Sequence, residues 1–292
     1  MKDEKRDYLI KTLSRTKRKD YENYIVNGIY HRLNCIDIQP VTQQHVLRSD
    51  GKRALIDLYF PQLNYGVECD EAYHLGNYEQ DITREITMEE MLSTIKETED
   101  FILRRVPAYE NLETIEESIK LIVEEILTLL EERNIDPWNY GEDAIETALN
   151  KETLSVADNL SFTKIIDICR CFGKEYKGMQ RSYFNIGNDY YLWCPKLAIE
   201  STDGLKSIAK GWINTLADDW EYIYETNDDI SKVEKLPRDK KRATFAKSKD
   251  VLGRNVYRFV GVFSHSPELS SKGNNVYRRI SEEINLKEWE LL

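Results

Sequence analysis

The stretch over residues 54–74 constrains the chain most, because it places acidic side chains in an otherwise apolar hairpin. Two runs rich in aliphatic and aromatic side chains flank the turn-forming sequence PQLN, which predicts two paired strands. Asp57 is the only acid in the first strand. Because side chains alternate along a strand, Glu68 and Asp70 are expected on one face of the second.

Pairing of these strands would gather Asp57, Glu68 and Asp70 at one end of the hairpin. Unneutralised acids in such a place repel one another and are poorly solvated, so a cation is expected with them. Oxygen ligands of this kind suit Mg²⁺, with Mn²⁺ as the alternative. The competing interpretation is that Asp57 bonds to backbone at a strand end and that the other two acids line a solvated face.

The order of one acid, a pair of acids and then His74 resembles the core of the PD-(D/E)xK nuclease superfamily. Asp70 stands where that family usually has lysine, which leaves the general base to be assigned. The sequence Asp81-x-x-Arg84, followed by Arg105, resembles the very-short-patch-repair (Vsr-like) branch. In that branch a histidine after the acids is thought to assist the attacking water, a role implied here for His74; the alternative is a turn or helix-capping histidine.

Two further candidates precede the hairpin. Apolar spacing predicts an amphipathic helix over residues 18–33, with Glu22 beside its apolar stripe. Nucleases of this superfamily often place a glutamate of the first helix at the metal site, so Glu22 is a candidate, against the alternative of a surface side chain. A strand is expected over residues 36–46. It carries Gln43 and Gln44 on opposite faces, where they could contact DNA or a metal-bound water, or lie on an exposed edge.

The order of the expected elements predicts the fold class of the first half. A helix over residues 78–98, a strand over 101–106 and a long amphipathic helix over 112–130 follow the hairpin. Helix, strands, helix, strand and helix in this order imply an α/β domain with a mixed sheet. The last helix is expected to turn its aliphatic residues, Leu127 among them, toward the sheet.

The length of 292 residues is comfortable for two domains. A turn-rich sequence follows the last helix, and within it Trp138 is expected to dock against one domain. We therefore expect a Vsr-like endonuclease domain over residues 1–135 and a second domain over residues 136–292.

The net charge and the cysteine content limit the kinds of partner and the cellular compartment that can be expected. The net charge is -11, and residues 1–140 hold 18 Lys+Arg against 28 Asp+Glu, while the remainder holds 23 against 24. Acidity is thus concentrated in the first half, and basic groups would have to line only a DNA cleft. Five scattered cysteines predict free thiols without structural zinc. No apolar run has membrane length and the first residues lack a signal core, so a soluble, cytoplasmic protein with no membrane partner is expected.

The sequence of the second half predicts a β-rich α+β domain built on a strongly curved sheet. One helix is expected over residues 162–172. Short apolar runs separated by Gly, Asn and Asp then predict strands over residues 190–193, 220–224, 244–246, 255–263 and 276–280.

Residues 245–263, FAKSKDVLGRNVYRFVGVF, resemble the closing strands of an SRA domain, a module that flips a modified cytosine out of duplex DNA. Together with GWIN at residues 211–214, CRCFG at 169–173 and the acidic hairpin, nearly the whole chain resembles restriction endonucleases that cut beside 5-hydroxymethylcytosine or its glucosylated form, the AbaSI type.

Base flipping would need aromatic walls and hydrogen-bonding side chains. Trp212 is the candidate stacking wall, with core packing as its alternative, and Asn214 can both donate to and accept from a cytosine edge. Methylcytosine-reading SRA domains commonly carry an aspartate where Val260 stands here, so the reading role is moved to Asp228. Trp193 is expected in the core.

DNA-backbone contacts are expected from Lys247, Lys249 and Arg254. The basic loop over residues 238–242 is expected either to contact phosphates or to be simply solvated.

The resemblance implies a modification-dependent (type IV) endonuclease that acts on double-stranded DNA. Mg²⁺ would be held by Asp57 and Asp70, and the attacking water would be activated by the metal and by His74 or Glu68. One site cuts one strand, so a homodimer formed through the N-terminal domain is expected. Three alternatives remain: a Vsr-like repair nickase, a modified-base reader without catalysis, and a metal-independent small-molecule hydrolase.

Overall fold

The computed structural model describes residues 4–14, 20–70, 92–138, 144–178, 181–187, 189–197, 211–217, 219–250 and 252–289. The chain divides into two compact units. The first contains the described residues up to 70 and those from 93 to 138; the second contains residue 92 and the described residues from 144 onward. Among the described helices, none has the length and apolarity required to cross a membrane.

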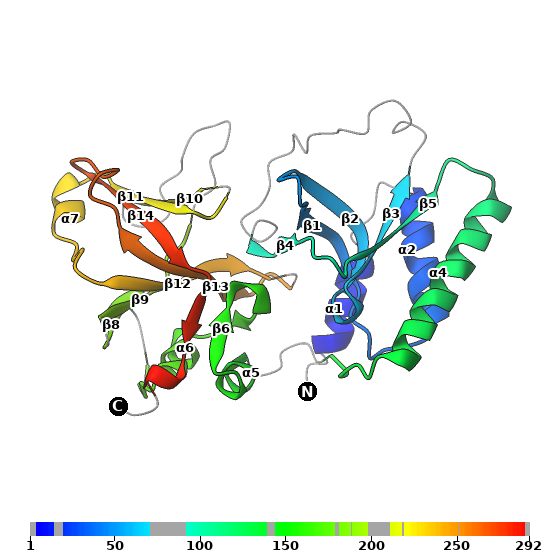
Figure 1. The fold of residues 1–292 in the computed structure, drawn as a ribbon, viewed down its shortest axis with the longest axis horizontal. Helices are drawn as coiled ribbons and strands as arrows, with labels where there is room; N and C mark the ends of the chain where they lie inside the picture. The colour runs from blue at the N-terminus through cyan, green and yellow to red at the C-terminus, as the bar shows by residue number, and fades with distance from the viewer. Residues whose placement is uncertain are drawn as a thin grey trace. The chain divides into compact units, whose positions relative to one another are not determined.

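The first unit is a five-stranded mixed sheet with helices packed on it (Figure 1). The strand order is β4-β1-β2-β3-β5, in which β1, β2 and β3 are antiparallel neighbours, β4 is parallel to β1 and β5 is parallel to β3. The fold class predicted for the first half is thus confirmed. Its elements are α1 (Glu4–Leu13), α2 (Asp20–Leu33), β1 (Val41–Leu47), β2 (Arg53–Phe60), β3 (Tyr65–Asp70), β4 (Ile95–Lys96), β5 (Ile102–Pro107) and α4 (Leu112–Glu132).

Helices α2 and α4 lie side by side on the sheet and bury their apolar stripes in one core (Figure 1). Asn111 begins α4, because its side chain accepts a hydrogen bond from the Thr114 N–H at 3.0 Å. Gly28 permits the close approach of the two helices, since a Cβ there would lie 3.3 Å from Ile119 Cδ1. Leu127 was expected to face inward but is 39% exposed, because it lies at the margin of the buried stripe.

Ile119 is fully buried in this core, and we expect Ile119→Ala to destabilise the first unit by about 2 to 4 kcal/mol. The substitution removes buried methyl groups and leaves a cavity against α2. Urea unfolding measures the change in free energy. Leu121→Ala is the matched control, because Leu121 lies on the same helix but is exposed, and its change should stay within about 0.5 kcal/mol. Equal losses for the two variants would contradict the packing described here.

Two sequence expectations for this unit are corrected. The helix expected over residues 78–98 lies largely outside the described residues, but its end is a strand, since Ile95 pairs in parallel with Val46 of β1. Gln44 is buried rather than on an exposed edge, because its amide donates to the Ser93 backbone carbonyl at 2.6 Å.

Trp138 packs within the first unit, and the centroid of its ring lies 5.2 Å from that of Tyr8.

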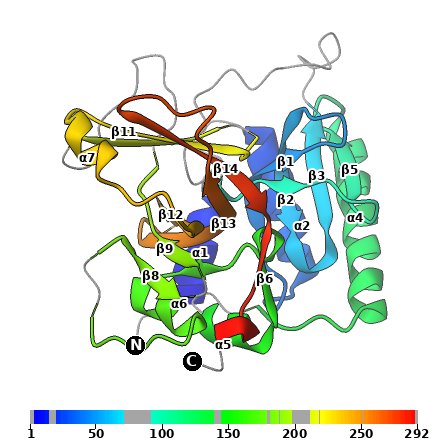
Figure 2. The same ribbon diagram turned by 60° about the vertical axis from the view of Figure 1, so that its left-hand side comes forward.

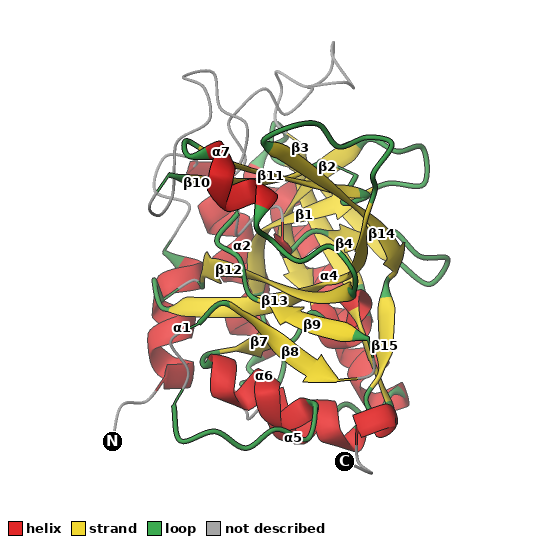
Figure 3. Ribbon diagram, turned by 90° about the vertical axis from the view of Figure 1, so that its left-hand side faces the viewer, coloured by secondary structure: helices red, strands yellow, loops and turns green. Residues whose placement is uncertain are grey.

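The second unit is built on a large sheet of order β10-β11-β14-β13-β12-β9-β8, with β7 also paired to β13 (Figure 2). Helices α5 and α6 lie toward one end of the unit, near β15 (Figure 3), and β15 pairs with β6 in a two-stranded ribbon. The predicted β-rich α+β class is confirmed. The elements are α5 (Ala144–Asn150), β6 (Thr153–Ser155), β7 (Ser161–Phe162), α6 (Ile165–Cys171), β8 (Tyr183–Gly187), β9 (Tyr190–Trp193), β10 (Trp212–Leu216), β11 (Tyr222–Asn227), α7 (Ile230–Glu234), β12 (Lys241–Lys249), β13 (Asn255–His265), β14 (Asn274–Ser281) and β15 (Glu283–Asn285).

Irregular pairing bends this sheet. The register shifts between Thr244 and Phe245 where β12 pairs with β13, and again between Val262 and Phe263 where β13 pairs with β14. Beside these shifts Gly261 has φ 120, a conformation that favours glycine. Such bulges increase twist and curvature. The curvature lets side chains of strands that are not neighbours meet on the inner face of the sheet.

Some boundaries in this unit differ from those expected. The helix expected from residue 162 begins at Ile165, because Phe162 pairs with Tyr257 of β13. The strand expected from residue 220 begins at Tyr222, because Trp220 adopts φ 63 in the preceding turn. Trp193 is buried in the core as expected, and all five cysteines are free thiols.

Candidate active site and nucleic-acid interface

Gln43 connects the two acids that precede β3. It lies on β1 opposite Asp57 of β2, because the flanking residues pair in register. Its amide nitrogen Nε2 donates to Glu22 Oε1 at 2.6 Å and to Asp57 Oδ1 at 3.1 Å. The backbone of Gln43 adopts φ 56, an uncommon conformation for a residue other than glycine. Such local strain is typical of positions where the direction of a side chain matters.

Asp57 and Glu22 are both held inside the first unit, at 8% and 1% exposure. Asp57 Oδ2 accepts a hydrogen bond from the Cys69 N–H at 2.7 Å, which ties the carboxylate to β3 between Glu68 and Asp70. The alternative of a surface position for Glu22 is therefore wrong. Asp57 does form a hydrogen bond with the backbone, as the competing interpretation expected. It also accepts a hydrogen bond from Gln43, whose amide donates to Glu22 as well.

Two arginines contact the acids of β3. Arg105 of β5 lies opposite Glu68 in the parallel register and contacts Glu68 Oε2 at 2.7 Å and Asp70 Oδ1 at 3.3 Å. Arg48 contacts Glu68 Oε1 at 3.2 Å. Burial raises the pKa of Glu68, although both arginines act in the opposite direction. The carboxylates of Glu68 and Asp70 are thus partly neutralised. The two arginines supply part of the positive charge that was expected from a cation.

The oxygen donors of Asp57 and Asp70 suit a divalent cation. The two hydrogen bonds of Asp57 described above come from neutral donors, and the Asp70 side chain is 32% exposed, so water and a cation can reach it. Within the described ranges, no three His, Cys, Asp or Glu side chains converge as a ready-made metal cluster. These two carboxylates would therefore need water or phosphate oxygens to complete a shell. His74, Asp81 and Arg84 lie outside the described residues.

In the second unit, β10 and β11 bring a different set of polar groups together. Trp212 is half-buried and Asn214 is buried, and both lie on the same face of β10. Asn214 pairs directly with Glu225 of β11, which is buried at 4% exposure. Asp228, predicted as the reading acid, is exposed beyond the end of β11. Its backbone N–H donates to the Gly211 carbonyl at 3.1 Å, next to Trp212.

Arg242 of β12 crosses the inner face of the sheet to reach Glu225. Its Nη1 lies 3.3 Å from Glu225 Oε2, although β13 and β14 separate the two strands in the sheet order. Three inter-strand spacings amount to about 14 Å in a flat sheet, so the contact depends on curvature. The placement of Arg242 in a basic loop that contacts phosphate or solvent is wrong, because β12 begins at Lys241 and buries the side chain.

Aromatic rings surround the Arg242 guanidinium. Its Cζ lies 3.8 Å from the ring centroid of Tyr277, 4.6 Å from that of Trp193 and 4.9 Å from that of Tyr183. The Tyr277 hydroxyl donates to Glu225 Oε2 at 2.9 Å. Burial raises the pKa of Tyr277 well above its usual value, so this hydroxyl stays a neutral donor. The rings and the acid together fix the position of the guanidinium.

Three buried polar atoms near this pair have no hydrogen-bond partner within the described part of the chain. They are Asn214 Oδ1, Asn275 Oδ1 and the Tyr183 hydroxyl oxygen. Asn275 lies opposite Glu225 in the β11–β14 register, and Tyr183 contacts Arg242. Unpartnered buried polar groups are costly, so ordered water or a ligand is expected to supply partners in this region.

The residues predicted to contact the DNA backbone lie on or beside β12 and β13. Lys247 Nζ lies 5.7 Å from the Tyr257 ring centroid, and Lys249 is exposed at the end of β12. Arg254 contacts Asp250 Oδ2 at 2.8 Å in the intervening turn. Their phosphate contacts stay predictions.

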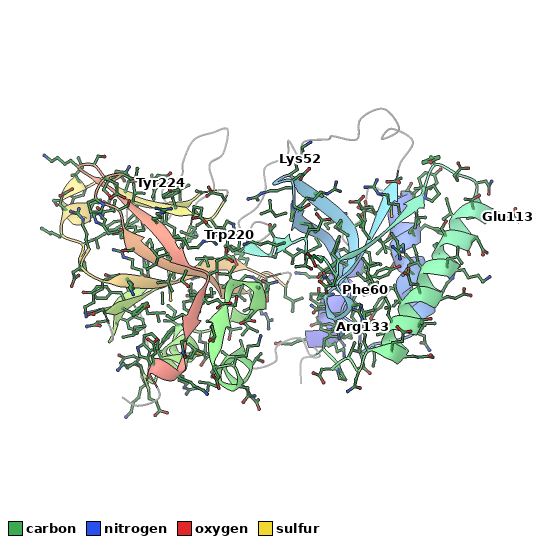
Figure 4. The ribbon with its side chains drawn as sticks, in the orientation of Figure 1. Lys52, Phe60, Glu113, Arg133, Trp220 and Tyr224 are labelled. Carbon is green, nitrogen blue, oxygen red and sulfur yellow. The ribbon has the colours of Figure 1, made fainter. Side chains whose placement is uncertain are left out.

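Glu225 and Arg242 were missed by sequence reasoning. Glu225 follows Tyr224, which is exposed on β11 (Figure 4), so the alternation of this strand turns Glu225 inward. Pairing residues 212–216 with the following strand would have placed Glu225 opposite Asn214. Nothing in the sequence could have identified Arg242, because its contact depends on the curvature of the sheet.

Comparison with known proteins assigns both units. The family model described as "Restriction endonuclease PvuRts1 I-like, N-terminal" matches residues 6–141, and the "SET and RING associated domain" (SRA) matches residues 147–286. The solved structure "The 5-Hydroxymethylcytosine-Specific Restriction Enzyme AbaSI" is 32% identical, with a TM-score of 0.70 over 96% of this chain and 97% of the other. No curated protein matches the chain.

An acidic, hydrogen-bonded site in a mixed-sheet unit, followed by an SRA unit, defines a DNA endonuclease of the restriction class. More particularly, the chain belongs to the PvuRts1I-like restriction endonucleases.

Proposed function

We propose that this endonuclease is modification-dependent (type IV) and hydrolyses DNA at a distance from 5-hydroxymethylcytosine or its glucosylated form. The observation that carries the proposal is likeness along 96% of the chain to a solved enzyme described as 5-hydroxymethylcytosine-specific. The buried polar groups around Glu225 support a base-binding role for the SRA unit. Five free thiols fit action in a reducing compartment such as the cytoplasm.

Asp57 and Asp70 would hold Mg²⁺ in the first unit. When bound, the metal would supply an activated water and offset charge on the phosphate. Gln43 orients the Asp57 carboxylate, and Glu22 in turn fixes the Gln43 amide. Arg105 lies within reach of Asp70 and would help to bind the scissile phosphate. His74 or Glu68 would accept the proton of the attacking water, and burial raises the pKa of Glu68, which makes its carboxylate a stronger base.

The SRA unit would read one extruded base. Trp212 offers a stacking wall, while Asn214 and Glu225 offer an amide and an acceptor for the cytosine edge. Lys247, Lys249 and Arg254 would contact phosphates of the flanking duplex.

Digestion of four matched phage DNAs tests the proposal. The DNAs carry cytosine, 5-methylcytosine, 5-hydroxymethylcytosine or glucosylated 5-hydroxymethylcytosine, and each is incubated with Mg²⁺ and with chelator. We expect cutting of the last two substrates only, and none in chelator. Equal digestion of all four DNAs would contradict modification dependence. In a separate assay, nicking of a mismatched unmodified duplex would favour the repair nickase. Binding of modified DNA without any cleavage would favour a reader. Cutting in chelator would remove the metal from the proposal.

A homodimer is the second part of the proposal, because one active site cuts one strand. We expect a mixture of wild-type and Asp57→Asn chains, co-expressed to form mixed dimers, to nick supercoiled modified plasmid and leave open circles. Gel electrophoresis separates open circles from linear product. As the control, wild-type and Asp57→Asn proteins are purified separately and mixed just before the assay. Linear product from purified mixed dimers, at the wild-type rate, would contradict one cut per protomer.

A further inference from the structure

The Arg242–Glu225 ion pair is the most deeply buried pair of opposite charges in the described part of the chain. The two side chains are 1% and 6% exposed. Buried pairs of this kind are often no better for stability than apolar residues of similar volume, so stability alone does not explain this pair. Its position beside Asn214 suggests a role in binding instead.

We infer that Arg242 is a positioning residue that selects cytosine over uracil-type bases by keeping Glu225 an acceptor-only group. The inference rests on the proposed function of the SRA unit and deepens it. A carboxylate only accepts hydrogen bonds, whereas a protonated acid or an amide also donates. A buried carboxylate without a counter-charge takes up a proton rather than remain charged.

Arg242 is suited to this role because it cannot turn away from Glu225. Its guanidinium is packed against the rings described above, and its Nη2 donates to the Pro237 carbonyl at 3.3 Å. Both Arg242 and the Tyr277 hydroxyl bond to Glu225 Oε2. The second oxygen, Oε1, is used by neither of them and is the atom we assign to the base.

The chemistry of the base edge explains the selection. Cytosine carries an N4 amine that donates, whereas uracil and thymine carry an O4 that accepts. A carboxylate therefore accepts from the cytosine N4 amine but repels the uracil O4. 5-Hydroxymethyluracil has the same substituent at C5 as 5-hydroxymethylcytosine, so comparing the two bases separates reading of the base edge from recognition of the hydroxymethyl group.

Equilibrium binding to three duplexes tests the inference. The duplexes share one sequence and carry 5-hydroxymethylcytosine, 5-hydroxymethyluracil or cytosine opposite the same guanine, and fluorescence anisotropy gives each Kd. We expect wild-type protein to prefer hydroxymethylcytosine over hydroxymethyluracil, and Arg242→Met to reduce this ratio at least about tenfold. Arg242→Lys, which retains the charge, should keep most of the ratio even if both affinities fall.

Arg279→Met is the matched control. Arg279 is 8% exposed and pairs with Glu221 at 2.8 Å, so it resembles Arg242 in burial and charge but not in position. It should leave the ratio unchanged. If Arg242→Met does not fold, the double variant Arg242→Met/Glu225→Gln removes both charges and decides the question; thermal unfolding reports its folding, and its ratio should also collapse.

A wild-type ratio in Arg242→Met or in the double variant would overturn the inference, as would a wild-type protein that binds the two hydroxymethylated bases equally. A wild-type protein that fails to distinguish 5-hydroxymethylcytosine from cytosine would instead overturn the proposed function.

Discussion

Replacing Asp57 with asparagine is expected to abolish cleavage of modified DNA while binding persists. The amide keeps the size of the side chain and one oxygen for the Cys69 N–H, so the link between β2 and β3 survives. It loses the charge with which the carboxylate would hold a cation. We expect a loss of at least about 1000-fold, which equals about 4 kcal/mol of barrier. Single-turnover cleavage of a glucosylated plasmid measures the rate, and a gel shift measures binding.

Asp50→Asn is the matched control for this variant. Asp50 is an exposed acid in the loop between β1 and β2, where its carboxylate accepts from the Lys52 N–H at 2.9 Å. Its replacement should leave both cleavage and binding close to wild type. Full cleavage by Asp57→Asn would place the active site elsewhere. Joint loss of cleavage, binding and thermal stability would make Asp57 a structural residue.

The acidic hairpin could be predicted from sequence because its determinants are local. Alternation fixes the faces of β2 and β3, and the turn between them follows from Pro61 and Asn64, whose φ of 50 is one that asparagine tolerates. The partners of the acids could not be predicted in the same way. Contact of Arg105 with Glu68 depends on the register of two parallel strands, and the Gln43–Glu22 bond depends on how α2 packs on the sheet.

The side chains that lie together on β10 and β11 could be predicted only in part. Trp212 and Asn214 were identified through a resemblance in sequence, and the structure places them on one face of β10. Asp228 was predicted as the reading acid, and Glu225, three residues before it, was not singled out, because the register of β10 with β11 is not evident from short strands of mixed polarity. Arg242 was taken for part of a surface run, since a cluster of basic residues in sequence is usually solvated. Only the curved sheet turns it inward.

Glu225→Gln is expected to weaken binding of 5-hydroxymethylcytosine duplex by about 10- to 100-fold, the range for hydrogen bonds to a charged group. Glutamine has nearly the same volume, so β11 should keep its packing, and its amide oxygen can still accept from Tyr277. It cannot balance the charge of Arg242, and its amide nitrogen donates toward the cytosine amine, which also donates. Anisotropy with the modified duplex measures the loss, and cleavage at saturating enzyme should be largely restored because the nuclease site is unchanged.

Glu221→Gln is the matched control for Glu225→Gln. It removes the same charge at a different position in the SRA unit. Glu221 precedes β11 in the same unit and pairs with Arg279, away from Asn214. Loss of one carboxylate there should change binding less than about twofold, since the Glu221 side chain is 41% exposed and water can replace it beside Arg279. Equal weakening by the two substitutions would mean that the acidic charge of the unit, rather than the contact of Glu225 with the base, governs affinity. Unchanged binding by Glu225→Gln would remove Glu225 from the reading site and with it the reason for an arginine at its side.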